Sequence, residues 1–390
     1  MDKKNKNPNV PNLRFNEFSL SWHQMRIIDL LSFQNGINGT PEQYGKGIKY
    51  ISVGDILNND YITYDKIAGS IDINQETLKN YSVTYGDILF QRSSEIKEDI
   101  GRTNVYLDKD HTATFGGFVI RGKKIGDYNP TFFNYLLKSP SSRQSIVRLG
   151  AGAQHYNIGQ ENIKTLNFYF PDEEEQQKIA NLFSKIDERI QTQIKIIDTL
   201  LSEINSIRSL IFNKSSLKWI PLKDIVAEQD IKLKRGKVIP KHKKNLKYIY
   251  PVYSSSITNS GLMGYSDSYM FNQELITWSI DGGGNFFYRK KHKFNITNVS
   301  GYMILNENLF NYQFIVQSLI WQHEKLKFDY QTKAHPSVVE SLYKIPIMDL
   351  EEQHKYACLF SNLNEKYELE LHILDLLNMQ KKYLLKNMFV

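Results

Sequence analysis

Two stretches of the sequence decide the fold: Pro171-Asp-Glu-Glu-Glu-Gln-Gln-Lys-Ile-Ala-Asn-Leu-Phe183 and Asp349-Leu-Glu-Glu-Gln-His-Lys-Tyr-Ala-Cys-Leu-Phe360. They align without a gap, and the alignment extends over residues 170–212 and 347–389 with fourteen identical positions out of 43. Two unrelated helices can share a hydrophobic period, but they do not share a run of matching polar residues as well. The chain therefore contains an internal repeat.

Both copies are predicted to be long helices. Asp172 and Asp349 suit the N-cap position, and each is followed three residues later by a glutamate, as in a capping box. From Phe183 to Ile211 apolar residues recur every 3.5 residues on average, which is the coiled-coil period. The predicted seam of this helix consists of Phe183, Ile186, Ile190, Ile194, Ile197, Leu201, Ile204, Ile207 and Ile211. Neither stretch contains Pro or Gly after its cap, so each helix reaches about 40 residues, or about 60 Å. Antiparallel packing of the two helices would bury both apolar stripes.

Weaker parallels precede each long helix, such as Ser21-Trp22 with Lys218-Trp219, and Gly117-Phe-Val-Ile120 with Gly301-Tyr-Met-Ile304. The expected fold is α/β (mixed α+β): two similar globular domains separated by two long antiparallel coiled-coil helices, with a pseudo-twofold internal repeat. The expected segments are a flexible N-terminal tail at 1–20, a first domain at 21–169, a central helix at 170–213, a second domain at 214–346 and a C-terminal helix at 347–390.

Composition favours a folded protein and is compatible with a polyanionic partner, although the charge alone does not indicate one. The chain has 390 residues, a net charge of +7 and 13% aromatic residues, which argues against disorder. Cys358 is the only cysteine, which excludes intrachain disulfides and cysteine-cluster zinc sites. No apolar run approaches the roughly 20 residues of a membrane helix, and the first residues do not resemble a signal peptide. The expected compartment is the cytoplasm.

No catalytic motif emerges from the sequence. There is no G-x-x-x-x-G-K-[ST] loop, no paired His-x-x-x-His with a glutamate, and no metal-ligand spacing among the nine histidines. We therefore expect no catalytic residues, no metal and no cofactor in this chain. Two other classes remain open: an enzyme on a duplicated fold, which would need convergent acids, bases or a cofactor loop, and a coiled-coil scaffold that does not read DNA.

Polar loops provide candidates for DNA contact. Eight basic residues lie between Lys232 and Lys247, where Gly236 and Pro240 favour a loop, and ammonium groups suit phosphates. The phosphate candidates are Lys46, Lys232, Lys234, Arg235, Lys237, Lys241, Lys243, Lys244, Lys290 and Lys291. Other polar residues have side chains that can pair with base edges. In this sequence several of them follow apolar stretches or glycine-rich segments. These base-reading candidates are Gln91, Arg92, Ser93, Gln154, His155, Ser255, Asn259, Ser279, Asn285, Arg289 and His335.

This layout resembles the specificity (S) subunit of type I restriction-modification systems. The two repeated helix starts carry the resemblance, together with Tyr85-Gly-Asp-Ile-Leu89, which is similar to a strand entry of the family. The second copy departs from it, with Asn272-Gln-Glu-Leu-Ile276 in its place. The resemblance implies two target recognition domains, each reading one half of a split sequence in double-stranded DNA, and a subunit that is itself non-catalytic.

The resemblance also implies partner proteins. Two methyltransferase (M) subunits and restriction/motor (R) subunits would carry S-adenosylmethionine, ATP and Mg, and the whole complex would be an adenine-specific DNA methyltransferase and an ATP-dependent endonuclease. No membrane partner is expected. The repeated polar residues at the two helix starts are the docking candidates: Glu174, Glu175, Gln176, Lys178, Glu351, Glu352, Gln353 and Lys355.

Overall fold

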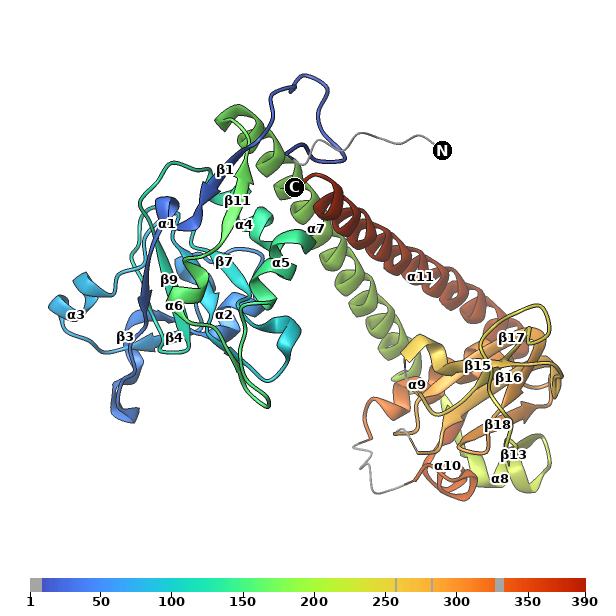
Figure 1. The fold of residues 1–390 in the computed structure, drawn as a ribbon. Coiled ribbons are helices and arrows are strands. Elements are labelled where there is room, and N and C mark those ends of the chain that lie inside the picture. Colours follow the sequence, from blue (N-terminus) through green and yellow to red (C-terminus); the bar gives the residue numbers. More distant parts are fainter. Residues whose placement is uncertain (1–8, 257, 282, 327–332) are drawn as a thin grey trace. The chain divides into compact units, whose positions relative to one another are not determined.

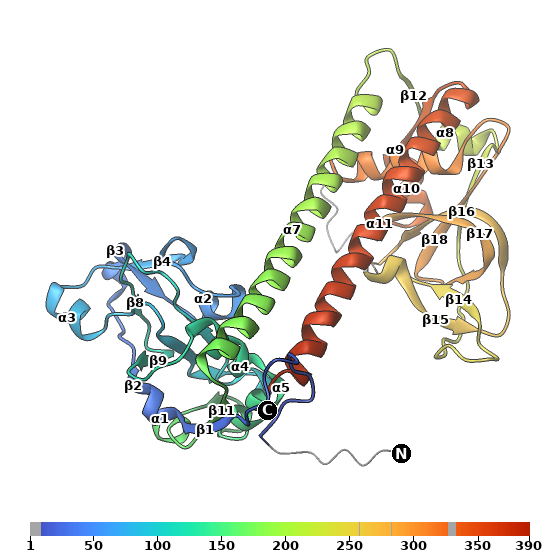
Figure 2. The same cartoon turned by 90° about the horizontal axis from the view of Figure 1, so that it is seen from above.

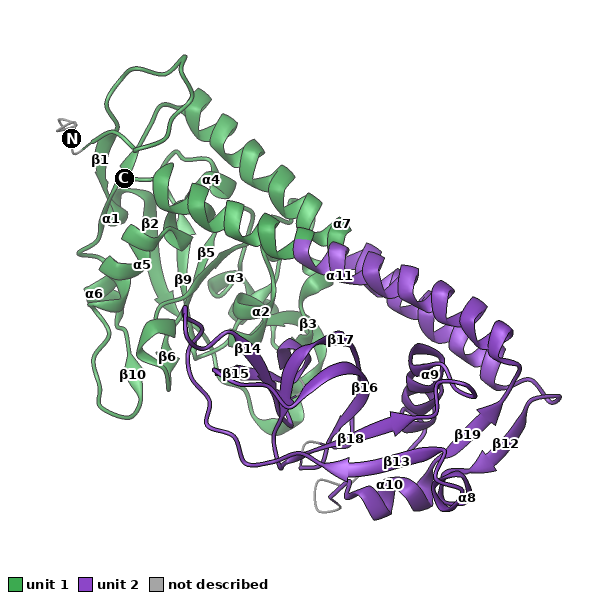
Figure 3. Cartoon of the chain, turned by 90° about the vertical axis from the view of Figure 1, so that its right-hand side faces the viewer, with its two compact units in different colours: residues 1–193, 373–390 green, residues 194–372 purple. Residues whose placement is uncertain are grey.

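The computed structural model describes residues 9–256, 258–281, 283–326 and 333–390. The chain divides into two compact units, Met1–Gln193 with Ile373–Val390, and Ile194–His372 (Figure 3). The first unit holds the start of the long helix α7 (Glu173–Phe212) and the end of the long helix α11 (Leu350–Asn387). The second unit holds the end of α7 and the start of α11. Each unit therefore combines one globular domain with parts of both helices.

The two long helices agree closely with the prediction from the repeat. They begin one residue after the predicted caps, and both caps form: Asp172 Oδ1 accepts from the Glu175 amide at 2.9 Å, and Asp349 Oδ1 from the Glu351 amide at 2.8 Å. The predicted seam of α7 is wrong at Leu201, which is 39% exposed, whereas Leu200 is buried at 3%. The apolar stripe therefore shifts by one residue there.

The C-terminal end of α11 lies in the core of the first domain, which α7 follows in the sequence. The C-terminal end of α7 lies in the core of the second domain, which α11 follows. In the first unit, Met388 and Phe389 follow the end of α11 and lie in the core. The ring of Phe389 packs against that of Phe183, near the start of α7, with 5.6 Å between the ring centroids. In the second unit, Ile211 and Phe212 at the end of α7 belong to the same core as Phe360 near the start of α11. Within each unit the two helices consequently run in opposite directions.

The domain of the first unit consists of small sheets with helices against them (Figure 1). A four-stranded sheet has the order β2-β9-β5-β7, a three-stranded sheet the order β4-β3-β8, and two-stranded ladders join β1 to β11 and β6 to β10. The bounds are β1 (His23–Arg26), α1 (Ile27–Leu30), β2 (Leu31–Asn35), β3 (Tyr44–Ile51), α2 (Val53–Asn58), β4 (Gly69–Ile71), α3 (Gln75–Asn80), β5 (Ile88–Gln91), β6 (Ser93–Ser94), β7 (Thr103–Val105), β8 (Thr114–Phe115), β9 (Val119–Lys124), α4 (Pro130–Lys138), α5 (Pro140–Val147), β10 (Tyr156–Asn157), α6 (Gln160–Ile163) and β11 (Asn167–Phe170).

The domain of the second unit is built around one larger sheet (Figure 2). Six strands have the order β13-β18-β16-β17-β14-β15, and a two-stranded ladder joins β12 to β19. The bounds are β12 (Lys218–Pro221), α8 (Leu222–Ala227), β13 (Ile231–Arg235), β14 (Tyr250–Tyr253), β15 (Leu262–Ser266), β16 (Phe271–Ser279), β17 (Phe286–Ile296), β18 (Ser300–Leu305), α9 (Tyr312–His323), α10 (Pro336–Leu342) and β19 (Lys344–Ile347).

The two domains differ where the sequence motif differs. In the first, Gly86 has a φ of +91° and the buried Asp87 accepts backbone hydrogen bonds from Thr84 at 3.0 Å and Lys124 at 2.9 Å, which sets the turn before β5. At the aligned residues 272–276 the second domain forms no such turn, because these residues belong to β16, which begins at Phe271 and pairs with β17 in a long hairpin. The missing Gly-Asp motif therefore reflects a longer strand.

The N-terminal segment is more ordered than predicted. Arg14 forms two hydrogen bonds with the buried Glu175 carboxylate, at 2.8 and 2.6 Å, and the Leu13 amide donates to the Asn387 carbonyl at 2.8 Å. Lys178 pairs with Glu17. The expected flexible tail is thus wrong for residues 9–20, which bind both long helices, while residues 1–8 lie outside the described residues.

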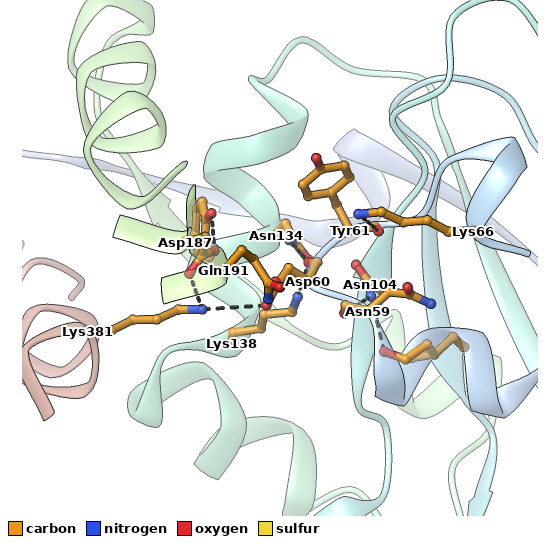
Figure 4. Close-up of polar contacts among 12 residues, drawn as sticks. Asn59, Asp60, Tyr61, Lys66, Asn104, Asn134, Lys138, Asp187, Gln191 and Lys381 are labelled. Atoms are coloured by element: carbon orange, nitrogen blue, oxygen red, sulfur yellow. Dashed lines mark hydrogen bonds and ion pairs between the residues drawn. The ribbon is translucent and has the colours of Figure 1, made fainter. Parts of the chain in front are cut away.

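A polar junction around Asp60 joins three helices of the first unit (Figure 4). Lys381 of α11 lies 2.5 Å from Asp187 of α7 and 3.8 Å from the Asp60 carboxylate. Lys138 of α4 donates to the Asp60 carbonyl at 2.6 Å, and burial lowers the pKa of Lys138 to about 8. Gln191 of α7 donates to the Asp60 carboxylate at 3.2 Å. These contacts fix the first domain to both long helices.

Candidate nucleic-acid interface

In the first unit, a short ladder brings together candidate base readers from two distant loops. Strand β6 pairs with β10, so that Ser93 lies opposite Asn157, and Ser93 Oγ donates to Asn157 Oδ1 at 2.6 Å. Arg92 precedes this ladder on one strand, and Gln154 and His155 precede it on the other; all three side chains are exposed. Asn157 is a further exposed polar side chain here that the sequence reasoning missed.

Gln91 lies beside this cluster but is not available for base contact. Its side chain is 5% exposed, and its Nε2 atom donates to the Ser93 carbonyl at 2.8 Å. Gln91 ends the buried strand β5, whose four residues are all buried. The prediction of a base-reading role is therefore wrong for Gln91, which supports the turn that carries Arg92 and Ser93.

In the second unit, candidates gather around the turn end of the β16–β17 hairpin. Ser279 is completely buried, and its hydroxyl donates to the Ser255 carbonyl at 2.8 Å, while its amide donates to the Asn285 carbonyl at 3.1 Å. Ser279 is therefore wrong as a base reader. It fixes the backbone of two other candidates, Ser255 and Asn285, which are partly exposed.

Arg289 is also buried, which contradicts its predicted contact with a base. Its side chain is 5% exposed, and burial lowers its pKa to about 10, so the guanidinium stays charged at neutral pH. The group donates to Thr277 Oγ1 at 3.0 Å and to the Ser260 carbonyl at 2.7 Å. An arginine pairs with guanine through exposed nitrogens, which Arg289 does not offer.

The basic stretch 232–247 is only partly a loop. Lys232, Lys234 and Arg235 lie on strand β13, at the edge of the six-stranded sheet, whereas Lys237, Lys241, Lys243 and Lys244 follow it in irregular structure. All seven side chains are exposed. Arg235 donates to the Asn298 carbonyl at 2.8 Å and lies 3.2 Å from His335 Nε2, so these two candidates share one site.

The remaining phosphate candidates lie elsewhere and are exposed. Lys46, in the first domain, forms an ion pair with Asp72 at 3.3 Å. Lys290 forms one with Glu365 of α11 at 2.9 Å, and Lys291 follows it on β17. Because exposed ion pairs are weak, Lys46 and Lys290 can exchange their carboxylates for a phosphate at little cost.

A basic groove lies in the second domain. Lys241, Lys243, Lys244, Asn259 and Tyr265 help to line it, and its volume is about 530 Å³. Residues 242 and 265 exchange two backbone hydrogen bonds of 3.0 Å, which fix the lysine-bearing loop to strand β15. Tyr265, which sequence reasoning missed, lies under the Lys244 ammonium at 5.4 Å from the ring centroid.

The predicted docking residues divide into buried and exposed sets. Glu175, Gln176 and Gln353 are 0%, 7% and 1% exposed, so the prediction that they contact a partner is wrong. The Gln176 side chain accepts a hydrogen bond from the backbone amide of Asn129, the N-cap of α4, at 3.0 Å. The Gln353 side chain accepts the equivalent bond from the backbone amide of Asn311, the N-cap of α9, at 2.9 Å. Both copies of the repeat therefore contain this bond. Glu174, Lys178, Glu351, Glu352 and Lys355 are exposed.

Among the residues that the structure describes, no three His, Cys, Asp or Glu side chains are grouped so that they could hold a metal ion. None of the described helices combines the length and the apolar character that a membrane crossing requires.

Comparison with known proteins identifies the class. The family described as "Type I restriction modification DNA specificity domain" matches twice, at residues 21–201 and 218–379. These matches cover most of the chain, which therefore belongs to this family. The fold agrees with the crystal structure of a type I restriction-modification S subunit from M. genitalium, with a TM-score of 0.65, 19% identity and coverage of 98% of this chain and 99% of the other.

Sequence relatives carry corresponding names. A protein of Mycoplasma pneumoniae named as a type I specificity subunit is 34% identical over 115 residues, or 27% of this chain and 36% of the relative. One of Methanocaldococcus jannaschii, named as the specificity subunit of a type I restriction enzyme, is 27% identical over 214 residues, or 54% of this chain and 49% of the relative. The chain thus spans about half or less of these curated relatives.

Proposed function

We propose that this chain is the sequence-specific DNA-binding subunit of a type I restriction-modification complex. Each domain recognises one half-site of a bipartite target in double-stranded DNA. One observation carries the proposal: each of the two units has a cluster of exposed polar side chains whose backbone is held by strand pairing or backbone hydrogen bonds. These are the β6–β10 ladder with Arg92 and Gln154 in the first domain, and the groove beside Asn259 in the second.

Phosphate and base contacts divide between different side chains. Lysines supply sequence-independent attraction to the DNA backbone, whereas Arg92, Gln154 and Asn259 carry the donors and acceptors that distinguish base pairs. The two domains share a repeat but differ in sheet size and loops. They therefore recognise different half-sites.

The long helices dock partner subunits. Their starts carry matching exposed charges in both copies, with Glu174 and Lys178 on α7 corresponding to Glu351 and Lys355 on α11. Two equivalent surfaces suit two identical methyltransferase subunits. Restriction subunits join the same complex, and S-adenosylmethionine, ATP and Mg belong to these partners. The chain itself is non-catalytic and acts in the cytoplasm.

Selection from a random DNA pool tests this function. We expect the chain, purified with its methyltransferase partners, to retain duplexes that share two short half-sites separated by a spacer of constant length and variable sequence. A mobility-shift assay on the selected duplexes gives the affinity, and duplexes with one half-site scrambled are the control. Retention of a single continuous motif, or of all sequences alike, would contradict the proposal, and a scaffold without DNA contact would retain none.

A further inference from the structure

Arg289 of β17 is a buried cation without a carboxylate partner among the described residues. Its nitrogens donate to Thr277 Oγ1 and to the Ser260 carbonyl, and its guanidinium carbon lies 3.8 Å from the centre of the Tyr253 ring. Burying a charged group is costly unless its contacts compensate. Arg289 therefore has a defined task in this domain, and its contacts point to the segment that contains Ser260.

That segment has an unusual backbone. Asn259, Ser260 and Gly261 have φ values of +48°, +49° and +80°, so three successive residues adopt the left-handed conformation. Residues other than glycine rarely adopt it, and the surrounding structure must hold them there. The Ser254 amide donates to the Gly261 carbonyl at 2.8 Å, and Arg289 holds the preceding carbonyl, that of Ser260.

The turn places Asn259 beside lysines. Asn259 is exposed and lines the groove with Lys241, Lys243 and Lys244, whose loop is fixed to β15 by the bonds between residues 242 and 265. An asparagine amide matches the donor and acceptor that adenine presents in the major groove, and lysines suit the neighbouring phosphates. The groove therefore combines both kinds of contact within one domain.

We propose that Arg289 is a positioning residue for sequence reading by the second domain. It holds the Ser260 carbonyl and the left-handed turn, and thereby presents Asn259 to a base at the groove. Arg289 makes no DNA contact itself. The inference rests on the proposed function, because it concerns one half-site of the DNA target.

The substitution Arg289→Lys tests this role, because lysine keeps the charge but lacks the planar group that reaches Thr277 and Ser260 together. We expect discrimination at one base pair of the second half-site to fall by about 5- to 150-fold. The preference at the first half-site and the salt dependence of binding should not change. Asn259→Ala should lose discrimination at the same base pair, and adding Arg289→Lys should produce little further loss.

Two control variants separate positioning from general effects. Arg143 is a partly buried arginine of the first domain that donates to the carbonyls of Gly101 and Ile100, both at 2.7 Å, so Arg143→Lys should leave the second half-site unchanged. Replacing Lys241, Lys243 and Lys244 with alanine should weaken binding to all sequences alike and reduce the salt slope by up to about one unit per lost phosphate contact.

The outcomes distinguish this inference from the proposed function. A wild-type complex without any sequence preference would contradict the proposed function. A selective wild type whose Arg289→Lys variant keeps full discrimination, or loses affinity for all sequences equally together with a lower melting temperature, would overturn the positioning role alone. If Arg289→Lys does not fold, Asn259→Ala decides, because unchanged discrimination by this exposed variant would equally overturn the inference.

Discussion

Glu175→Ala is expected to lower the free energy of unfolding of the first unit by about 3–5 kcal/mol, because it leaves the Arg14 cation half-buried without its partner. The Glu175 carboxylate is completely buried and accepts two hydrogen bonds from Arg14 and one from the Trp22 indole at 3.2 Å. It thus connects the N-terminal segment, the start of the first domain and the start of α7. Denaturant unfolding of the purified chain measures the change.

The repeat supplies a matched control for this prediction. Glu352 is the corresponding residue of the second copy, but its side chain is exposed. Glu352→Ala should therefore change the unfolding free energy by no more than about 0.5 kcal/mol. Equal effects of the two substitutions would show that the contact between Glu175 and Arg14 does not stabilise the first unit.

Phe389→Ala is the second substitution with a large expected effect, a loss of about 3–5 kcal/mol located in the first unit. Phe389 is 4% exposed and packs against Trp22 and Phe132, with ring centroids 6.4 and 5.6 Å away. Alanine would leave a cavity among these aromatic rings. Hydrogen exchange should show faster exchange in residues 21–193, although the substitution lies next to the last residue of the chain.

Two further substitutions locate that effect. Phe212, the repeat equivalent of Phe389, is 1% exposed in the core of the second unit, so Phe212→Ala should accelerate exchange there instead. Leu376→Ala, on the helix α11 that precedes Phe389 but at a position that is 49% exposed, should have little effect. Faster exchange in the second unit after Phe389→Ala would refute the described placement of the α11 end.

The long helices could be predicted because their signals are local. Asp172 and Asp349 cap their own first turns, and the apolar period runs uninterrupted by Pro or Gly. The burial of Glu175 could not be predicted, since an acidic residue in the first turn of a helix is ordinarily solvated, close to the dipole. Its partners, Arg14 and Trp22, are more than 150 residues away in the sequence.

The candidate site shows the same division between local and distant information. The sequence identified the polar loops that contain Arg92, Gln154 and Asn259, all of which are exposed. It did not separate the residues that face solvent from those that support the loops. Arg289 and Gln91 have the side chains of base readers, but strand pairing buries them under the turns that they hold.

The exchange of one domain tests the central claim, one half-site per domain, most directly. Residues 21–165 would be replaced with the corresponding segment of another family member, and the methylome of cells that express the chimera with its partner subunits would be sequenced. The account predicts that one half of the modified bipartite motif changes while the other half remains as in the parent. A change in both halves, or in neither, would contradict it.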